Sequence, residues 1–339
     1  MSNPARIALL HIGGEKTGTT TLQATLAANR AALAGAGILY SRAAGRDAHG
    51  LLALYASAGA GTADLRAAMG LDQPGHFENF LARFPSILAR EAADSGARVL
   101  IYSSEHLSSR LHDESAVERV RTLLAQVADE VHLVYYARPQ AELVLAAWST
   151  MLKSGSAAPF SLAAALSNPT LFDHAALVTR WAEAFPGSPW RFRPYQSGLL
   201  TDNDIVADFC ACTGLAPGLL RRRVTRLNRS LDTPRAEFLR LWNGLPRAMD
   251  GPRRGQMIRV LESLSEGPPL GLDPADVATL ESRYGAGNAA LARHFLGRER
   301  LFADRAPPLP PAGPLLAAEQ AVAIAASLWD FPRAAAGAG

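Results

Sequence analysis

The chain has 339 residues, of which 48% are hydrophobic and 19% are charged, and its formal net charge at pH 7 is +3. This length can bury a sizeable core, and the composition is that of an ordinary globular protein rather than of a disordered chain. Because the net charge is small, it does not indicate a nucleic-acid partner, and we expect none.

Apolar runs are short throughout the sequence. None reaches the roughly 18 residues that a membrane-spanning helix needs, and the N-terminal run at 7–10 is too short for the core of a signal peptide. We therefore expect no transmembrane segment and a cytoplasmic location. No cysteine–histidine cluster has zinc-site spacing, and Cys210 and Cys212 lie two apart on one expected helix, so we expect neither a metal site nor a disulfide.

In chain order, short strand-like runs alternate with longer amphipathic stretches. The expected strands are 6–11, 37–40, 98–103, 131–137 and 190–193. The expected helices between and after them are 19–34, 76–94, 115–128, 140–152, 174–184 and 203–213. The strands are almost continuously apolar, which is typical of strands that are covered by helices on both faces. The sequence therefore predicts an α/β fold with a parallel central sheet flanked by helices.

Beyond residue 214 the pattern is helical, at 233–243, 255–264 and 274–295. A proline-rich segment at 306–314 is typical of a linker, and a last helix is expected at 315–329 within the C-terminal tail. We expect one α/β domain over residues 1–305, including a helical C-terminal portion, followed by the linker and by the tail at 315–339.

The first strand runs into a glycine-containing loop and then into a helix that begins with three threonines. Gly13, Gly14 and Gly18 let the backbone turn tightly, and free N–H groups at the start of a helix bind phosphate. Thr19, Thr20 and Thr21 can cap the helix and offer hydroxyls to a phosphate. The loop is not a Walker A motif, because Thr19 follows Gly18 where that motif has lysine.

Lys16 instead lies inside the loop, and it is one of only two lysines among the 34 basic residues. The segment from His11 to Gln23, HIGGEKTGTTTLQ, resembles the 5′-phosphosulfate loop of bacterial sulfotransferases that use 3′-phosphoadenylyl sulfate, PAPS. Further segments resemble the same family, in the same order along residues 5–303: GILY at 37–40, IYSSE at 101–105, YARPQ at 136–140 and NAALARHFLGRERLF at 288–302.

The resemblance implies a P-loop NTPase-like sulfotransferase fold, PAPS as donor, 3′,5′-adenosine diphosphate (PAP) as product, and no metal. It assigns the donor's 5′-phosphosulfate to the loop, through Gly14, Lys16, Thr17, Gly18, Thr19, Thr20 and Thr21. Sulfuryl transfer builds negative charge on the bridging oxygen, and a compact lysine cation suits this task. The alternative for Lys16 is a solvated surface lysine.

The reaction also needs a general base at a strand end within reach of the loop. Glu105 occupies the position at which the family has its catalytic carboxylate or histidine, and His106 is a second candidate. The alternatives are that Glu105 caps the next helix or pairs with an arginine, and that His106 contributes to packing or substrate binding.

Arg138 follows the fourth strand and corresponds to the family's arginine for the 3′-phosphate, the alternative being a structural ion pair. The family's partner serine, eight residues on, is replaced by Ala146, and Ser149 could substitute for it one helical turn later. Asn228 and Arg229, in a basic segment, are further expected nucleotide contacts.

The acceptor is a hydroxyl or an amine of a small molecule, lipid or glycan. His49 and Trp148 are candidate acceptor-site residues. The alternative for His49 is an ordinary loop position, and the alternative for Trp148 is packing of its helix. His11 is expected to be a hydrogen-bonded core histidine. Two other functions stay open: a P-loop-type nucleotide kinase, and a non-catalytic nucleotide-binding module.

Overall fold

The structure is a computed structural model of the chain. It describes residues 5–167, 169–216, 218–221, 230–246, 251–304 and 307–330. The described residues divide between two compact units, one within residues 1–139, 169–225 and 284–303, the other within 140–168, 226–283 and 304–339. No described helix is long and apolar enough to cross a membrane.

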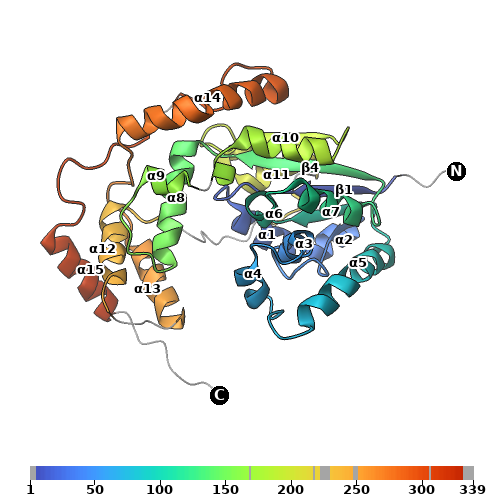
Figure 1. Cartoon of the computed structure of the whole chain (residues 1–339), viewed down its shortest axis with the longest axis horizontal. Helices are drawn as coiled ribbons and strands as arrows, with labels where there is room; N and C mark the ends of the chain where they lie inside the picture. Colours follow the sequence, from blue (N-terminus) through green and yellow to red (C-terminus); the bar gives the residue numbers. More distant parts are fainter. Residues whose placement is uncertain are drawn as a thin grey trace. The chain divides into compact units, whose positions relative to one another are not determined.

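The first unit contains a five-stranded sheet, in which the order is β2-β3-β1-β4-β5 and every described pairing is parallel (Figure 1). Its strands are β1 (Ile7–His11), β2 (Ile38–Tyr40), β3 (Val99–Ser103), β4 (Glu130–Ala137) and β5 (Trp190–Pro194). All five lie at the positions predicted from the apolar runs, and the α/β class with a parallel, helix-flanked sheet is confirmed.

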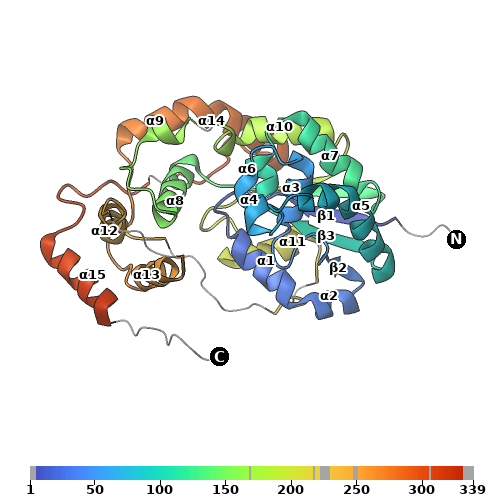
Figure 2. The same cartoon turned by 60° about the horizontal axis from the view of Figure 1, so that its bottom comes forward.

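Helices cover both faces of this sheet, as Figure 2 shows. On one face, α1 (Thr19–Ala28), α2 (Arg30–Gly35) and α11 (Ile205–Thr213) bury leucine, isoleucine and phenylalanine side chains against alternate residues of the strands. The opposite face is covered by α3 (Gly50–Ser57), α5 (His76–Ser95), α6 (His106–Arg110), α7 (Glu114–Leu124) and α10 (His174–Ala184). The short helix α4 (Ala63–Ala68) also contributes Leu65 to that core.

The long helix that was predicted over 19–34 is two helices. Asn29 interrupts it, with φ −104° and ψ 16°. The Asn29 amide bonds the backbone of Arg221 in both directions, donating from Nδ2 to the carbonyl at 2.9 Å and accepting from the N–H at 3.0 Å. These bonds to a distant segment account for the break, which local helical periodicity does not signal.

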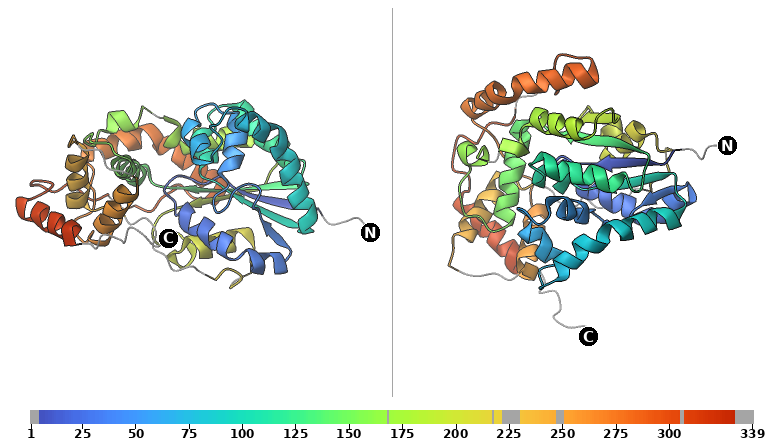
Figure 3. Two further views of the ribbon diagram at one scale, coloured as in Figure 1. Left: turned by 90° about the horizontal axis from the view of Figure 1, so that it is seen from below. Right: turned by 45° about the vertical axis from the view of Figure 1, so that its right-hand side comes forward.

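The second unit is helical. It contains α8 (Gln140–Lys153), α9 (Leu162–Ala165), α12 (Thr233–Asn243), α13 (Gly251–Ser263) and α15 (Ala318–Asp330), which are seen together in Figure 3. Its core includes Leu152, Phe238, Leu239, Leu261 and Ile324. The helix α14 (Pro274–Leu296) contributes its first residues to this unit and those from Tyr284 onward to the first unit.

Candidate functional site

The carboxyl ends of β1, β3 and β4 meet at one edge of the sheet. His11, the last residue of β1, is in register with Ser103 of β3 and with Val134 of β4. The segments that follow these strands, which begin at Ile12, Ser104 and Arg138, therefore lie along the same edge. In parallel α/β sheets this edge is where ligands bind.

The loop after β1 continues along β4 before it turns. Ile12 donates its N–H to the Val134 carbonyl at 3.0 Å, and the Gly13 carbonyl accepts from the N–H of Tyr136 at 2.8 Å. A Cβ at Gly14 would lie 2.4 Å from the Tyr136 carbonyl oxygen, so no larger residue fits at that position. Because it has no side chain, Gly14 therefore allows the loop to pack closely against β4.

The middle of the loop is held in a left-handed turn. Lys16 has φ +60°, which is uncommon for a residue with a side chain. Arg138 donates from Nη1 to the Lys16 carbonyl at 2.7 Å, and Thr17 donates from Oγ1 to the Gly14 carbonyl at 2.7 Å. The Lys16 side chain is half-buried. The loop is thus fixed by Arg138, which follows β4, and by a hydrogen bond between two of its own residues.

The helix α1 begins at this loop without a threonine cap. Its N-cap is Gly18, at φ +77°, and no side chain accepts from the first turn. The capping role expected for the threonines is therefore wrong: Thr19, Thr20 and Thr21 form the first turn itself. No described residue accepts a hydrogen bond from the N–H groups of Gly18, Thr19 or Thr20. Unpaired N–H groups of this kind, together with the helix dipole, can bind an anion.

Glu105 lies directly beside the loop. A Cβ at Gly13 would be 2.7 Å from Glu105 Cα, so the two backbones are in contact. Neither alternative that the sequence left open for Glu105 is observed. Its side chain does not cap α6, and it accepts a 2.7 Å hydrogen bond from Nε2 of Gln23, not from an arginine. Gln23, the last residue of the segment that resembles the sulfotransferase loop, is buried in α1, and its pairing with Glu105 is not apparent from the sequence.

Beneath the loop, Ser103 lies between two buried histidines. His49 Nδ1 accepts from the Ser103 N–H at 3.0 Å, and His49 Nε2 lies 2.9 Å from the Ser41 carbonyl, to which it donates. His11 Nδ1 lies 2.7 Å from the Ser103 hydroxyl. Burial lowers the pKa of each histidine from 6.5 to about 3, so both are neutral at pH 7.

This geometry corrects the assignment of His49 to an acceptor site. The side chain is fully buried, both ring nitrogens are bonded within the fold, and the ring packs on Tyr40 at 4.3 Å between centroids. Its role in the described structure is to join β3 to the segment after β2. His11 is the core histidine that was expected, hydrogen-bonded through Nδ1.

The backbone at Arg138 is fixed by a third buried histidine, His174, which no sequence motif marks. His174 Nε2 donates to the Arg138 carbonyl at 2.8 Å, and its Nδ1 therefore accepts from the Tyr135 hydroxyl, also at 2.8 Å. Burial lowers the pKa of His174 to about 4, although the bond to Arg138 opposes that shift. The guanidinium of Arg138 also lies over the ring of Tyr195, 5.8 Å from its centroid.

His106 opens α6 and is half-buried beside Gly50, and no described group bonds its buried Nδ1. Ser149 and Trp148 both belong to the second unit. The Ser149 hydroxyl is buried there without a described partner. Trp148 donates from Nε1 to the Ala158 carbonyl at 3.2 Å and packs edge-on against Phe160. These contacts agree with the packing role that was the alternative for Trp148. Asn228 and Arg229 lie outside the described residues.

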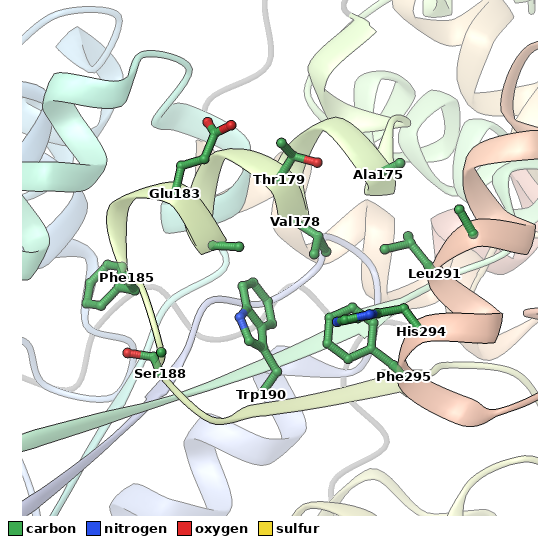
Figure 4. Close-up of a pocket in the computed structure, with 13 residues that line it drawn as sticks. Ala175, Val178, Thr179, Glu183, Phe185, Ser188, Trp190, Leu291, His294 and Phe295 are labelled. Atoms are coloured by element: carbon green, nitrogen blue, oxygen red, sulfur yellow. The ribbon is translucent and has the colours of Figure 1, made fainter.

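The first unit also has an open apolar cavity of about 590 Å³. It is lined by α10, by Trp190 at the start of β5, and by Leu291, His294 and Phe295 of α14 (Figure 4). Trp190 is at the amino end of its strand, whereas the loop lies at the carboxyl ends. The cavity is therefore separate from the loop edge.

Within the described residues, no three histidine, cysteine or acidic side chains are grouped so that they could hold a metal ion. Comparisons with family models, with curated proteins and with solved structures each give no significant match.

Proposed function

We propose that this protein is a PAPS-dependent sulfotransferase, which moves a sulfuryl group from PAPS to a hydroxyl or amine of a small-molecule, lipid or glycan acceptor. The observation that carries the proposal is the loop between β1 and α1. It holds Lys16 in a braced left-handed turn two residues before Gly18, and the N–H groups of Gly18, Thr19 and Thr20 are unpaired among the described residues.

The donor set suits a 5′-phosphosulfate. Backbone N–H groups at a helix N-terminus favour a phosphate without a bound cation, and a lysine ammonium beside them adds a compact positive charge. Because Gly13 is in contact with the backbone of Glu105, a carboxylate is available beside the same loop. Anion-binding groups and a proton acceptor are thus adjacent, as acyl and phosphoryl transfer enzymes also require.

In the proposed reaction, an acceptor oxygen or nitrogen forms a bond to sulfur while the bond from sulfur to the 5′-phosphate oxygen breaks. The acceptor's proton goes to Glu105, and the products are the sulfated acceptor and PAP. Lys16 stabilises the negative charge that develops on the departing phosphate oxygen. Arg138 keeps the loop in the conformation in which Lys16 is presented, through the bond to the Lys16 carbonyl.

A nucleotide kinase is the competing enzyme. Such enzymes place lysine next to the last glycine of the loop and hold Mg²⁺ through an acidic residue. Here Thr19 occupies the lysine position. The strand β3 is followed by Ser104 and Glu105, and the Glu105 carboxylate is bonded by Gln23. Both features depart from the pattern of a nucleotide kinase.

Calorimetry without Mg²⁺ tests the proposal. We expect PAP to bind the 339-residue chain with a Kd of about 10 μM or tighter, equivalent to about 7 kcal/mol. Lys16→Ala should weaken this binding and should lower PAP release from PAPS at least about tenfold. Lys153→Ala is the matched control, since Lys153 is the other lysine and pairs with Glu262 in the second unit. Binding of ATP with Mg²⁺ but not of PAP would refute the proposal in favour of a kinase. PAP binding with no release from PAPS, across a panel of hydroxylated and amine acceptors, would indicate the non-catalytic module.

A further inference from the structure

The carboxylate of Glu105 is held by one buried amide. Gln23 donates from Nε2 to Glu105 Oε2 at 2.7 Å and lies 3.4 Å from the Ser103 carbonyl through the same nitrogen. No other described side chain bonds the Glu105 carboxylate. Because both neighbours of the amide nitrogen are acceptors, the reversed amide would set its oxygen against two oxygens, so this orientation is fixed.

The amide also links Glu105 to the anion-binding loop. Gln23 is one turn after Thr19 in α1, the helix whose first N–H groups are unpaired, and its side chain is only 3% exposed. The same helix therefore carries the unpaired N–H groups at the loop end and the amide that bonds the carboxylate. A neutral amide can fix the direction of a carboxylate without adding a formal charge, which an arginine in its place would add.

We infer that Gln23 is a positioning residue for the general base of the proposed reaction. It holds Oε2 of Glu105, so that the remaining oxygen, Oε1, has one defined direction from which to accept the acceptor's proton. This inference rests on the proposed sulfotransferase function, and it assigns Gln23 no contact with donor or acceptor.

The substitution that tests it is Gln23→Met, which keeps the length and the unbranched shape of the side chain but removes the donor. We expect kcat for PAP release from PAPS to fall about tenfold to hundredfold, the scale of a displaced catalytic group, while the KM for PAPS and the Kd for PAP stay within about twofold. Gln196→Met is the matched control, since Gln196 is equally buried in the same unit but bonds the backbone of Ala303. That variant should keep the wild-type kcat.

A double-mutant cycle separates positioning from general stabilisation. In the Glu105→Gln background, Gln23→Met should cause no further loss of kcat. An equal loss in both backgrounds, or a parallel loss of PAP affinity, would overturn the inference and give Gln23 a structural role. A wild-type kcat in Gln23→Met would overturn it as well. Should Gln23→Met fail to fold, Gln23→Asn keeps the amide but is one methylene too short to reach Glu105, and the same outcomes apply.

The two proposals fail in different ways. A wild-type protein that releases no PAP from PAPS refutes the sulfotransferase function, and the role of Gln23 with it. A wild-type protein that transfers the sulfuryl group while the cycle is additive refutes only the role of Gln23.

Discussion

Arg138 donates from Nη1 to the backbone carbonyl of Lys16 across 2.7 Å. The bond joins two residues 122 positions apart and holds the loop where its backbone is left-handed. The sequence predicts Arg138 as a clamp for the 3′-phosphate of the donor, whereas the observed bond fixes the part of the loop that is assigned to the 5′-phosphosulfate.

Replacing Arg138 by lysine distinguishes these two roles. A hydrogen bond from a charged donor is worth about 1.5–3 kcal/mol, so its loss should weaken nucleotide binding about tenfold to hundredfold. If Arg138 braces the loop, Arg138→Lys should weaken binding of PAP and of adenosine 5′-phosphate by similar factors, which calorimetry can measure.

A loss confined to PAP would contradict the bracing role and would support contact with the 3′-phosphate. The control is Arg121→Lys, because Arg121 pairs with Glu118 on the exposed surface of α7. This substitution should leave both affinities unchanged.

Gly14 should tolerate no side chain. In Gly14→Ala the new Cβ would meet the Tyr136 carbonyl oxygen at 2.4 Å, so the loop must leave β4. We expect this variant to lose PAP binding and at least about 2 kcal/mol of stability from the clash. Gly35→Ala is the control, since nothing lies within 4 Å of its added Cβ and helix propensity favours alanine there. Wild-type PAP affinity in Gly14→Ala would show that the loop need not pack on β4.

The strands were predictable because burial on both faces gives short, almost continuously apolar runs, and here these alternate with longer amphipathic segments. The helices α3 and α4 were not predicted. In α3 (Gly50–Ser57) six of eight residues are buried, so the segment lacks the polar face on which helical periodicity depends. In α1 and α2 the periodicity continues across a break that the contact between Asn29 and Arg221 accounts for.

The position of the candidate site was predictable from the glycines and Lys16, since the spacing of a strand, a loop and a helix is a local property. The hydrogen bonds within the candidate site were not predictable. Gln23 and Glu105 are 82 residues apart, and His174 is 36 residues from Arg138, so each pairing depends on the register of the sheet. Sequence alone does not distinguish a loop histidine that faces an acceptor from one whose two nitrogens are bonded internally, as those of His49 are.

Three buried histidines should make the protein sensitive to acid. Burial lowers the pKa of His11 and His49 to about 3 and that of His174 to about 4, whereas the same residues have a pKa near 6.5 in the unfolded chain. Above about pH 7.5 all three are neutral in both states, and they add no pH dependence. Below it the unfolded chain takes up protons that the folded protein does not, so the free energy of unfolding falls as the pH drops from about 6.5 toward 4.

Each such histidine should remove roughly 1.4 kcal/mol per pH unit once the pH is well below 6.5. His49→Gln can still accept from the Ser103 N–H and donate toward the Ser41 carbonyl, but it does not titrate. Urea unfolding at pH 7.5, 6.0 and 5.0 should therefore show a shallower loss of stability in His49→Gln than in the wild type. The exposed His76 provides the control, and His76→Gln should keep the wild-type slope. An unchanged slope in His49→Gln would mean that His49 is protonated as readily in the folded protein as in the unfolded chain.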